Sequence, residues 1–279
     1  MTARSRDSRD SRARVITFAN QKGGVAKSTT AEAFAASLTA RGYAVLMVDM
    51  DAQPGNLSLH VGANKDLPGT QELLEHRHST RERTLRCIQP THSFGDVVCA
   101  NEELDDVDRR LNSRVGRELV LSRALAPVLD KYDFVVIDTP PALQVRTINA
   151  IAAANDVVVP CMADPSSVAG MEAVLDCVAE VGEFVRGATP SVAGIIVTRY
   201  DARNSLEPKM LDRIAEIADE YGTRLLGRGV RNTVSARKAQ YNAEALNEFA
   251  PQSTAAIDYD EAVSAYLKSI GIVDEGDNA

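Results

Sequence analysis

The sequence predicts an α/β protein with a doubly wound, mostly parallel sheet that carries helices on both faces. Two observations lead to this prediction. Short runs rich in Val, Ile and Phe are almost continuously apolar, which is typical of strands covered on both faces. Amphipathic helical patterns separate these runs, and parallel strands need such crossover connections. No internal repeat and no Pro/Ser-rich linker interrupts the pattern, so one domain over residues 14–272 is expected.

The first three elements are expected to form one βαβ unit. Residues 14–19 have the sequence RVITFA, which predicts a buried strand that stops at a glycine-rich turn. From Lys27 the small and apolar residues recur on one helical face, and Gly42 follows as the expected C-cap. The run YAVLMVDM at 43–50 predicts the second strand. A strand, a glycine turn, a helix and a second strand make up this unit.

The rest of the chain repeats the alternation. Further strands are predicted at 96–100, 133–138, 156–160 and 193–198. Helices are predicted at 111–129, 168–185, 206–221 and 258–270. The polar stretch 62–93 predicts loops and short helices, residues 1–13 a disordered basic tail, and residues 273–279 an acidic C-terminal tail.

Composition excludes several classes of protein. The chain is 44% hydrophobic and 25% charged, as in ordinary globular proteins, which excludes a disordered or collagen-like chain. It lacks the apolar run that a membrane span needs, and its first residues lack the apolar core of a secretory signal. The four cysteines form no C-x-x-C pair, which argues against a zinc or iron–sulfur cluster. We therefore expect a cytoplasmic protein that does not bind membranes.

The charge is uneven along the chain. The net charge of −8 argues against a protein that coats nucleic acid, but the interval 221–243 contains basic residues and no acidic residue. Its basic residues are Arg224, Arg228, Arg231, Arg237 and Lys238. Two interpretations are open at this point: a solvated face, or a local patch that binds phosphates.

The segment between the first strand and the first helix has the composition of a phosphate-binding loop. Gly23 and Gly24 let the backbone turn and aim N–H groups at an anion, at the start of a helix whose dipole favours negative charge. We expect Lys27 to reach the β- and γ-phosphates of ATP and the Ser28 hydroxyl to bind Mg²⁺. The residues expected to bind the phosphates are Lys22, Gly23, Gly24, Val25, Ala26, Lys27, Ser28 and Thr29.

Acidic residues follow two of the predicted strands. Asp138 ends the run FVVID, and Asp51 comes just after the second strand in VDMDAQ. The carboxyl ends of parallel strands share one edge of the sheet, so both acids are expected near Ser28. One acid would hold Mg²⁺ through water, and the other would position the attacking water. Asp49 is interpreted as a strand-end acid.

Three motifs, NQKGGVAKSTT, VDMDAQ and FVVIDTPP, together resemble the ParA family of the MinD-type deviant Walker A P-loop ATPases. The similarity extends from about residue 15 to about residue 267 and is closest to the short forms that lack an N-terminal helix-turn-helix domain. In this family the lysine before the glycine pair, here Lys22, reaches across an ATP-bound homodimer to the partner's phosphates. The resemblance makes Lys22 and Asp51 catalytic, and it implies that loss of Asp51 leaves ATP bound but unhydrolysed. It makes Asp138 the Walker B acid and residues 139–141 a switch that senses the γ-phosphate.

Two later segments also match the family. VTRYDAR and LGRGVR resemble segments near the adenine, which implies base contacts by Thr198, Arg199, Gly227 and Arg228. The second segment leads to a DNA-contacting surface in the family. This favours DNA phosphates as the ligand of Arg224, Arg228, Arg231, Arg237 and Lys238.

The resemblance implies a weak ATPase that dimerises on ATP and binds double-stranded DNA without sequence preference. A ParB-like adaptor on a centromere-like site would stimulate hydrolysis and release, so the protein would be associated with the nucleoid. The chain ends in VDEGDNA, whereas a membrane-cycling relative would end in a basic amphipathic helix. Two alternatives stay open: a positioning ATPase for a non-DNA cargo, and a nucleotide-binding scaffold that no longer hydrolyses ATP.

Gln21 and Ala26 replace the two glycines of the standard pattern G-x-x-x-x-G-K-[ST]. The sequence departs from the family pattern at three positions. Ala26 stands where the family usually has glycine, and it adds a Cβ close to the phosphates. Gly227 stands where a proline commonly abuts the base, and Pro54 interrupts the usual spacing between Gln and Gly in the loop after Asp51. The expected charged residues of the site are all present.

Overall fold

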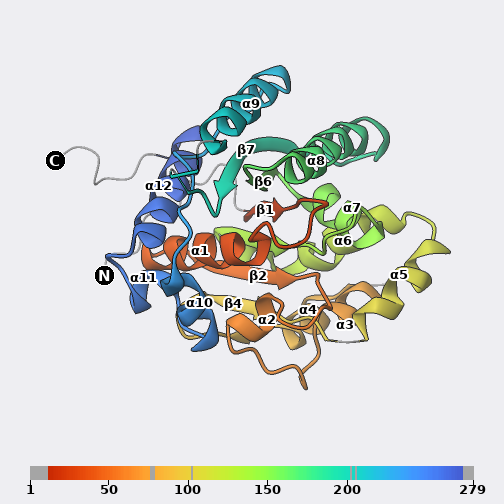
Figure 1. The fold of residues 1–279 in the computed structure, drawn as a ribbon. Helices are drawn as coiled ribbons and strands as arrows, with labels where there is room; N and C mark the ends of the chain where they lie inside the picture. Colours follow the sequence, from red (N-terminus) through yellow and green to blue (C-terminus); the bar gives the residue numbers. More distant parts are fainter. Residues whose placement is uncertain (1–11, 76–78, 102, 202, 205, 273–279) are drawn as a thin grey trace.

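The fold is built on one sheet whose strands run parallel except at one edge. The computed structural model describes residues 12–75, 79–101, 103–201, 203–204 and 206–272. Over these residues the strand order is β3-β4-β2-β5-β1-β6-β7, and β3 alone runs antiparallel to its neighbour (Figure 1). The strands are β1 (Arg14–Phe18), β2 (Val45–Asp49), β3 (Gln89–Pro90), β4 (Asp96–Val98), β5 (Phe134–Asp138), β6 (Asp156–Met162) and β7 (Ser191–Thr198). The predicted fold class is confirmed.

Helices cover both faces of this sheet. The longer ones are α1 (Lys27–Ala40), α5 (Leu104–Asn112), α7 (Val145–Ala153), α8 (Pro165–Phe184), α9 (Glu207–Glu220), α10 (Val234–Tyr241) and α12 (Thr254–Ser269). Short helices are α2 (Leu57–His60), α3 (Thr70–Glu75), α4 (Arg81–Arg86), α6 (Val120–Leu125) and α11 (Leu246–Phe249). One apolar cluster packs α1 and α12 on the first face, and two clusters pack α3 and α5–α9 on the second. In Figure 1, α8 and α9 lie at the β7 end of the sheet and α2–α4 at the β4 end.

Aromatic side chains join the first face to its helices. The rings of Phe18 on β1 and Phe34 on α1 meet edge to face with centroids 5.0 Å apart. The ring of Tyr266 on α12 lies 5.8 Å from that of Phe34. Such pairs add to the free energy of burying the rings, so α1, which begins at the phosphate loop, is held firmly between the sheet and α12.

The prediction of a single helix over residues 111–129 is wrong. The chain there forms the end of α5, a 3₁₀ turn at Arg117–Leu119, then α6 and a second 3₁₀ helix at Ala126–Lys131. Gly116 breaks the first helix because it adopts a left-handed conformation with φ 67°, and Pro127 enters at the start of the last segment. Helices α7 and α10 were not predicted.

The two predicted tails are largely outside the described residues. This applies to residues 1–11 and 273–279. Ala13 is buried, and its backbone N–H donates to the Leu129 carbonyl at 3.0 Å. Ala13 therefore packs with the domain that is expected to begin at residue 14.

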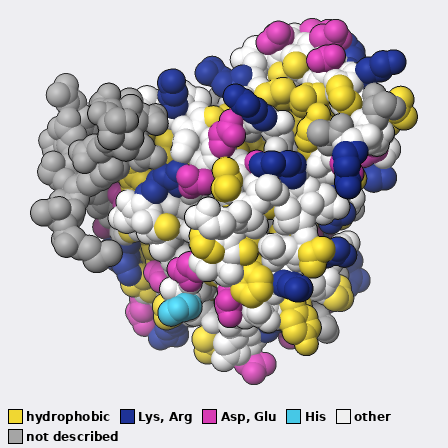
Figure 2. Space-filling view, turned by 60° about the vertical axis from the view of Figure 1, so that its left-hand side comes forward, with side chains coloured by type: hydrophobic (Ala, Val, Ile, Leu, Met, Phe, Trp, Pro, Cys, Tyr) yellow, Lys and Arg dark blue, Asp and Glu magenta, His cyan; other side chains and the backbone are white. Residues whose placement is uncertain are grey.

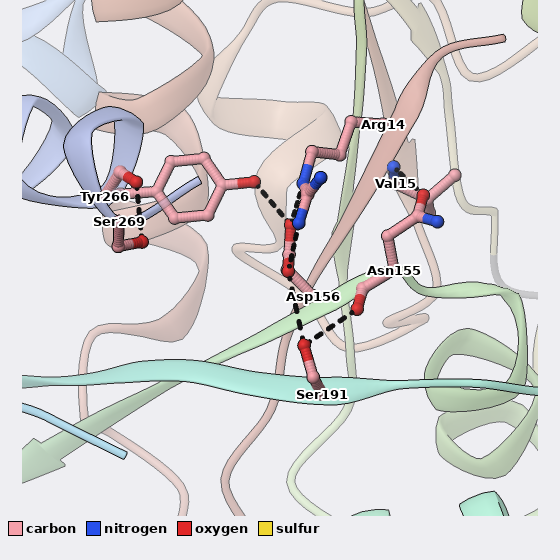
Figure 3. Close-up of polar contacts among 7 residues, drawn as sticks. All are labelled: Arg14, Val15, Asn155, Asp156, Ser191, Tyr266 and Ser269. Atoms are coloured by element: carbon pink, nitrogen blue, oxygen red, sulfur yellow. Dashed lines mark hydrogen bonds and ion pairs between the residues drawn. The ribbon is translucent and has the colours of Figure 1, made fainter. Parts of the chain in front are cut away.

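A buried polar network joins α12 to the amino ends of the strands (Figure 3). Asp156, at the start of β6, accepts two hydrogen bonds from the Arg14 guanidinium of β1. It also accepts one from the Tyr266 hydroxyl at 2.8 Å. Asp156 is almost fully buried, so these donors rather than water satisfy the hydrogen-bonding needs of its carboxyl oxygens. The network fixes α12 across the sheet, at the opposite edge from the phosphate loop.

Tyr266→Phe removes one donor from the buried Asp156 carboxylate while keeping the ring. We expect the free energy of unfolding to fall by about 1.5 kcal/mol, as for hydrogen bonds to charged groups. Urea denaturation measures this loss. Tyr241→Phe, at a hydroxyl on a 92% exposed side chain, is the matched control and should change stability by less than about 0.5 kcal/mol. Equal effects of the two variants would contradict this role of the network.

Candidate phosphate-binding site

The phosphate loop connects β1 to α1 at the carboxyl edge of the sheet. Gly24 has φ 78°, and the loop closes onto the sheet through Val25, whose side chain is fully buried. The Thr198 hydroxyl, at the end of β7, donates to the Val25 carbonyl at 2.9 Å. Thr139 anchors the loop after β5 in the same way, because its hydroxyl donates to the Phe18 carbonyl at 2.8 Å. Thr198 and Thr139 therefore fix the backbone around the site.

Ala26 is held in a strained conformation. It precedes α1 with φ 63° and ψ 35°, the left-handed region that a Cβ disfavours. Its carbonyl still accepts from the Thr30 N–H at 2.9 Å and the Thr30 hydroxyl at 2.7 Å. The loop thus keeps the conformation that a glycine would adopt freely, and the alanine at this position costs stability rather than changing the loop path.

The two lysines of the loop lie in different environments. Lys27 is buried, and its ammonium donates to the Lys22 carbonyl at 3.2 Å. Burial lowers the Lys27 pKa, while the negative charges of Asp138 and Asp51 oppose that shift. Lys22 is exposed. The backbone N–H of Lys22 donates to the Asn20 side chain at 2.8 Å, so its backbone is fixed while its side chain faces solvent.

Two acids meet at the ends of neighbouring strands. Asp49 and Asp138 occupy matching positions on β2 and β5, and both are fully buried. Asp49 accepts hydrogen bonds from the Ser58 N–H at 2.8 Å and the Asp51 N–H at 3.0 Å. Burial raises the Asp49 pKa to about 6, and these hydrogen bonds limit the shift. Asp49 therefore serves to hold the loop that follows β2, which agrees with its interpretation as a strand-end acid.

Asp138 has two neighbours that favour its charged form, the Ser28 hydroxyl and the Lys27 ammonium, but no hydrogen bond of normal geometry from the described residues. Burial, and then the charge of Asp49, raise its pKa well above the usual range, while the Ser28 hydroxyl and the Lys27 ammonium oppose that shift. A buried polar atom without a protein partner is costly unless a water or an ion binds it.

Ser28 and Asp138 fit a magnesium ion bound together with a nucleotide. Mg²⁺ takes oxygen ligands and usually keeps several waters beside one or two protein groups and the substrate phosphates. The Asp138 carboxylate is unpartnered and lies beside the Ser28 hydroxyl, as this mode of binding requires. Within the described parts of the chain, no three His, Cys, Asp or Glu side chains cluster as a metal site formed by protein alone would need.

The loop after β2 places Asp51 at this edge. Asp51 is half-buried, and its carboxylate accepts from the Gln53 N–H at 3.0 Å. Its carbonyl accepts from the Asn56 side chain at 2.6 Å, and Asn56 caps α2. Pro54 is accommodated in the turn between these residues, where Gly55 has φ 80°. The inserted proline therefore leaves Asp51 beside Lys27, whose pKa responds to the Asp51 charge.

A cleft of about 220 Å³ opens beside the loop. Ala26, Thr29, Arg199 and Tyr259 line it together with residues 230–233. Arg199 is a second non-glycine residue with positive φ, at 54°, so backbone strain gathers around this cleft, as is common at functional sites.

Of the four residues expected near the base, Arg199 lines the cleft and Thr198 supports the loop beneath it. Gly227 instead packs against the Ala262 backbone of α12, and the Arg228 side chain is 93% exposed. The chain reaches the cleft three residues later, because Tyr200 pairs with Arg231 in a parallel bridge. Asn232 and Thr233 also line the cleft; they belong to no sequence motif and were not predicted.

The five basic residues expected to contact DNA fall into two groups. Arg231 forms a two-pronged ion pair with Asp258 of α12, and Arg228 approaches Glu261 at 3.9 Å. Arg224, Arg237 and Lys238 are exposed and form no ion pair with the described residues. In Figure 2, which brings the α10–α12 side forward, basic side chains stand apart with acidic ones between several of them. On this face, a single chain thus presents scattered basic side chains rather than a continuous basic surface.

Ala26→Gly should stabilise the nucleotide-free protein. Glycine adopts φ 63° without the Cβ clash, so relief of strain should raise the free energy of unfolding by about 1 kcal/mol. The greater conformational entropy of glycine in the unfolded chain offsets part of this gain. Urea denaturation without nucleotide measures the change. Ala33→Gly, at an ordinary helical position of α1, is the control and should lower stability by about 1 kcal/mol. Destabilisation by both variants would show that Ala26 is not strained.

Sequence comparisons identify relatives along most of the chain. A family model described as an AAA domain matches residues 13–188. The chain is 30% identical to the chromosome-partitioning ATPase Soj of Treponema pallidum, over 89% of this chain and 94% of that protein. It is 33% identical to the chromosome partitioning protein ParA of Myxococcus xanthus, over 72% of this chain and 70% of the other.

Solved structures share the fold. The structure of cobyrinic acid a,c-diamide synthase from Mycobacterium smegmatis, with a bound ATP analogue and magnesium, is 31% identical over 93% of this chain and 96% of its own, with a TM-score of 0.77. A Cyanothece McdA–ATP complex has a TM-score of 0.81 at 21% identity, over 95% and 99% of the two chains, and shows the fold alone. No helix within the described segments has the length and apolarity to span a membrane. By its sequence motifs, its fold and its relatives, the chain belongs to the ParA family of partition ATPases.

Proposed function

We propose that this protein is an ATP-driven DNA-partition switch. It binds ATP with Mg²⁺, dimerises, and rides on non-specific double-stranded DNA of the nucleoid. It is released when a ParB-like adaptor stimulates hydrolysis. The observation that carries the proposal is the site itself, where exposed Lys22 stands beside the buried Lys27 and the unpartnered Asp138. The bound ATP analogue and magnesium of the M. smegmatis neighbour support these ligands.

Each charged residue of the site has a separate task in hydrolysis. Lys27 and the loop N–H groups would bind the β- and γ-phosphates, and Ser28 and Asp138 would hold the metal, Asp138 through water. When bound, Mg²⁺ neutralises charge that develops on the phosphates. Asp51, fixed by its own loop, orients the attacking water, and Lys22 of each protomer adds its charge to the other's phosphates. Because Lys22 acts only across a dimer, a single chain hydrolyses ATP slowly.

One alternative keeps the switch but changes the cargo, as a positioning ATPase for a protein assembly would. The McdA neighbour shares the fold, and both cargo types would use the same ATP chemistry. A scaffold without hydrolysis is disfavoured, because Ala26 keeps the glycine-like loop conformation and Asp51 reaches the site.

The M. smegmatis neighbour is named as a diamide synthase, which raises amide synthesis as a third function. Releasing ammonia from glutamine takes an activated thiolate. Burial raises the pKa of all four cysteine thiols here, Cys87 and Cys161 to about 12. These thiols are suited to packing, so we favour the partition switch.

The test is binding to a random-sequence duplex without nucleotide, with ADP and with ATP, at low and moderate salt. We expect wild type and Asp51→Ala to bind only with ATP, and Asp51→Ala to stay bound because it does not hydrolyse ATP. Arg237→Ala and Lys238→Ala should each reduce the magnitude of the slope of log K against log salt concentration by about 1 per binding site, where K is the association constant for the duplex.

Arg231→Ala is the matched control on the same surface. Because Asp258 already neutralises Arg231, its loss should change the salt dependence much less than the loss of Arg237. Absence of DNA binding in every nucleotide state would overturn the DNA model and favour a protein cargo. Equal effects of all three substitutions would contradict the division of the basic residues into two groups.

A further inference from the structure

Helix α10 has two faces that meet different parts of the molecule. On its inner face, Ala236 and Gln240 line the cleft beside the phosphate loop. On its outer face, Val234, Lys238 and Tyr241 are exposed around a shallow hollow. Arg237 borders both the cleft and the hollow. A helix of eight residues is too short to be stable alone, so its position depends on contacts with its neighbours.

Gln240 makes the polar contact between α10 and α1. Its side-chain amide nitrogen donates to the Thr29 hydroxyl oxygen at 2.8 Å and to Glu32 Oε2 at 3.0 Å. An amide NH₂ has two hydrogens, and both are used here. Thr29 directly follows Ser28 of the phosphate loop, so the position of α10 is tied to the loop that holds the nucleotide.

Glu32 extends this contact to the loop that carries Asp51. Glu32 is 6% exposed, and its second oxygen, Oε1, lies 2.6 Å from His60 Nδ1 on α2. Burial alone would lower the His60 pKa, but the hydrogen bond and charge of Glu32 raise it. Asn56, the N-cap of α2, donates a hydrogen bond from its side-chain amide to the Asp51 carbonyl. A continuous set of hydrogen bonds therefore joins the Asp51 loop and the phosphate loop to α10.

We propose that Gln240 is a positioning residue that couples ATP binding to presentation of the basic outer face of α10. This inference rests on the proposed function. A hydroxyl can donate one hydrogen bond and accept others. When the Thr29 hydroxyl donates to a phosphate, it still accepts from Gln240, and such chained hydrogen bonds strengthen one another. ATP binding therefore strengthens the contact that holds α10 in place, and with it Arg237 and Lys238, which face DNA in the proposed function.

Gln240→Leu tests this coupling because it keeps the side-chain bulk and removes both hydrogen bonds. Asn242→Leu is the matched control, since Asn242 is an exposed amide just after the same helix. Both variants are compared with wild type in three measurements: ATP affinity, hydrogen–deuterium exchange of residues 234–241 with and without ATP, and the ratio of random-duplex affinities with ATP and ADP. Melting temperatures verify that both variants fold.

We expect Gln240→Leu to bind ATP within about threefold of wild type, since the phosphate ligands remain. In this variant, ATP should no longer protect residues 234–241 from hydrogen exchange. The ratio of its duplex affinity with ATP to that with ADP should fall at least about fivefold, which corresponds to a modest allosteric coupling. Asn242→Leu should retain both. Unchanged protection and ratio in Gln240→Leu would overturn the proposal, as would a tenfold loss of ATP affinity, which would make Gln240 part of the ATP site.

The exchange measurement separates this inference from the proposed function. If wild type binds no DNA, the partition model fails, yet exchange of 234–241 still reports whether ATP orders α10 through Gln240. If wild type binds DNA with ATP but α10 exchange does not respond to ATP, the coupling fails and the partition model stands.

Discussion

The site depends on charge buried at the carboxyl edge of a parallel sheet. The register of β2, β5 and β1 places Asp49, Asp138 and Phe18 side by side at their ends, and α1 begins directly above them with buried Lys27. Charges in such a position are costly unless they are paired. Asp49 is satisfied by the loop it holds, whereas Asp138 is not. The fold thus leaves one acid incomplete at the place where magnesium and phosphate would bind.

Backbone strain around the cleft also depends on the rigid packing of the fold. Ala26 and Arg199 both have positive φ, and both line the cleft. The sheet, α1 and α12 hold these residues in place through buried aromatic contacts and through the Asp156 network at the opposite edge. Rigid packing away from the site therefore maintains a geometry at the site that is unfavourable by itself.

Much of this arrangement follows from local sequence patterns. The strands were predictable because they are continuously apolar, and the phosphate loop and its acids because parallel strands end at one edge. Gly227 was expected at the base, but pairing between Tyr200 and Arg231 sets the path of that segment, and no local pattern encodes such a bridge. Gln240 and Glu32 carry no motif, and their roles arise only where α1, α2 and α10 meet. The ion pair of Arg231 with Asp258 is likewise a tertiary contact.

We infer that bound Mg²⁺ supplies the partner that the buried Asp138 carboxylate lacks in the protein alone. Thermal unfolding of wild type and Asp138→Asn, each with ATP plus EDTA and with ATP plus Mg²⁺, tests this most directly, because a ligand stabilises the folded state according to its affinity. We predict that both proteins are stabilised by ATP in EDTA and that only wild type gains a further increment from Mg²⁺. An equal magnesium increment in Asp138→Asn would contradict the claim.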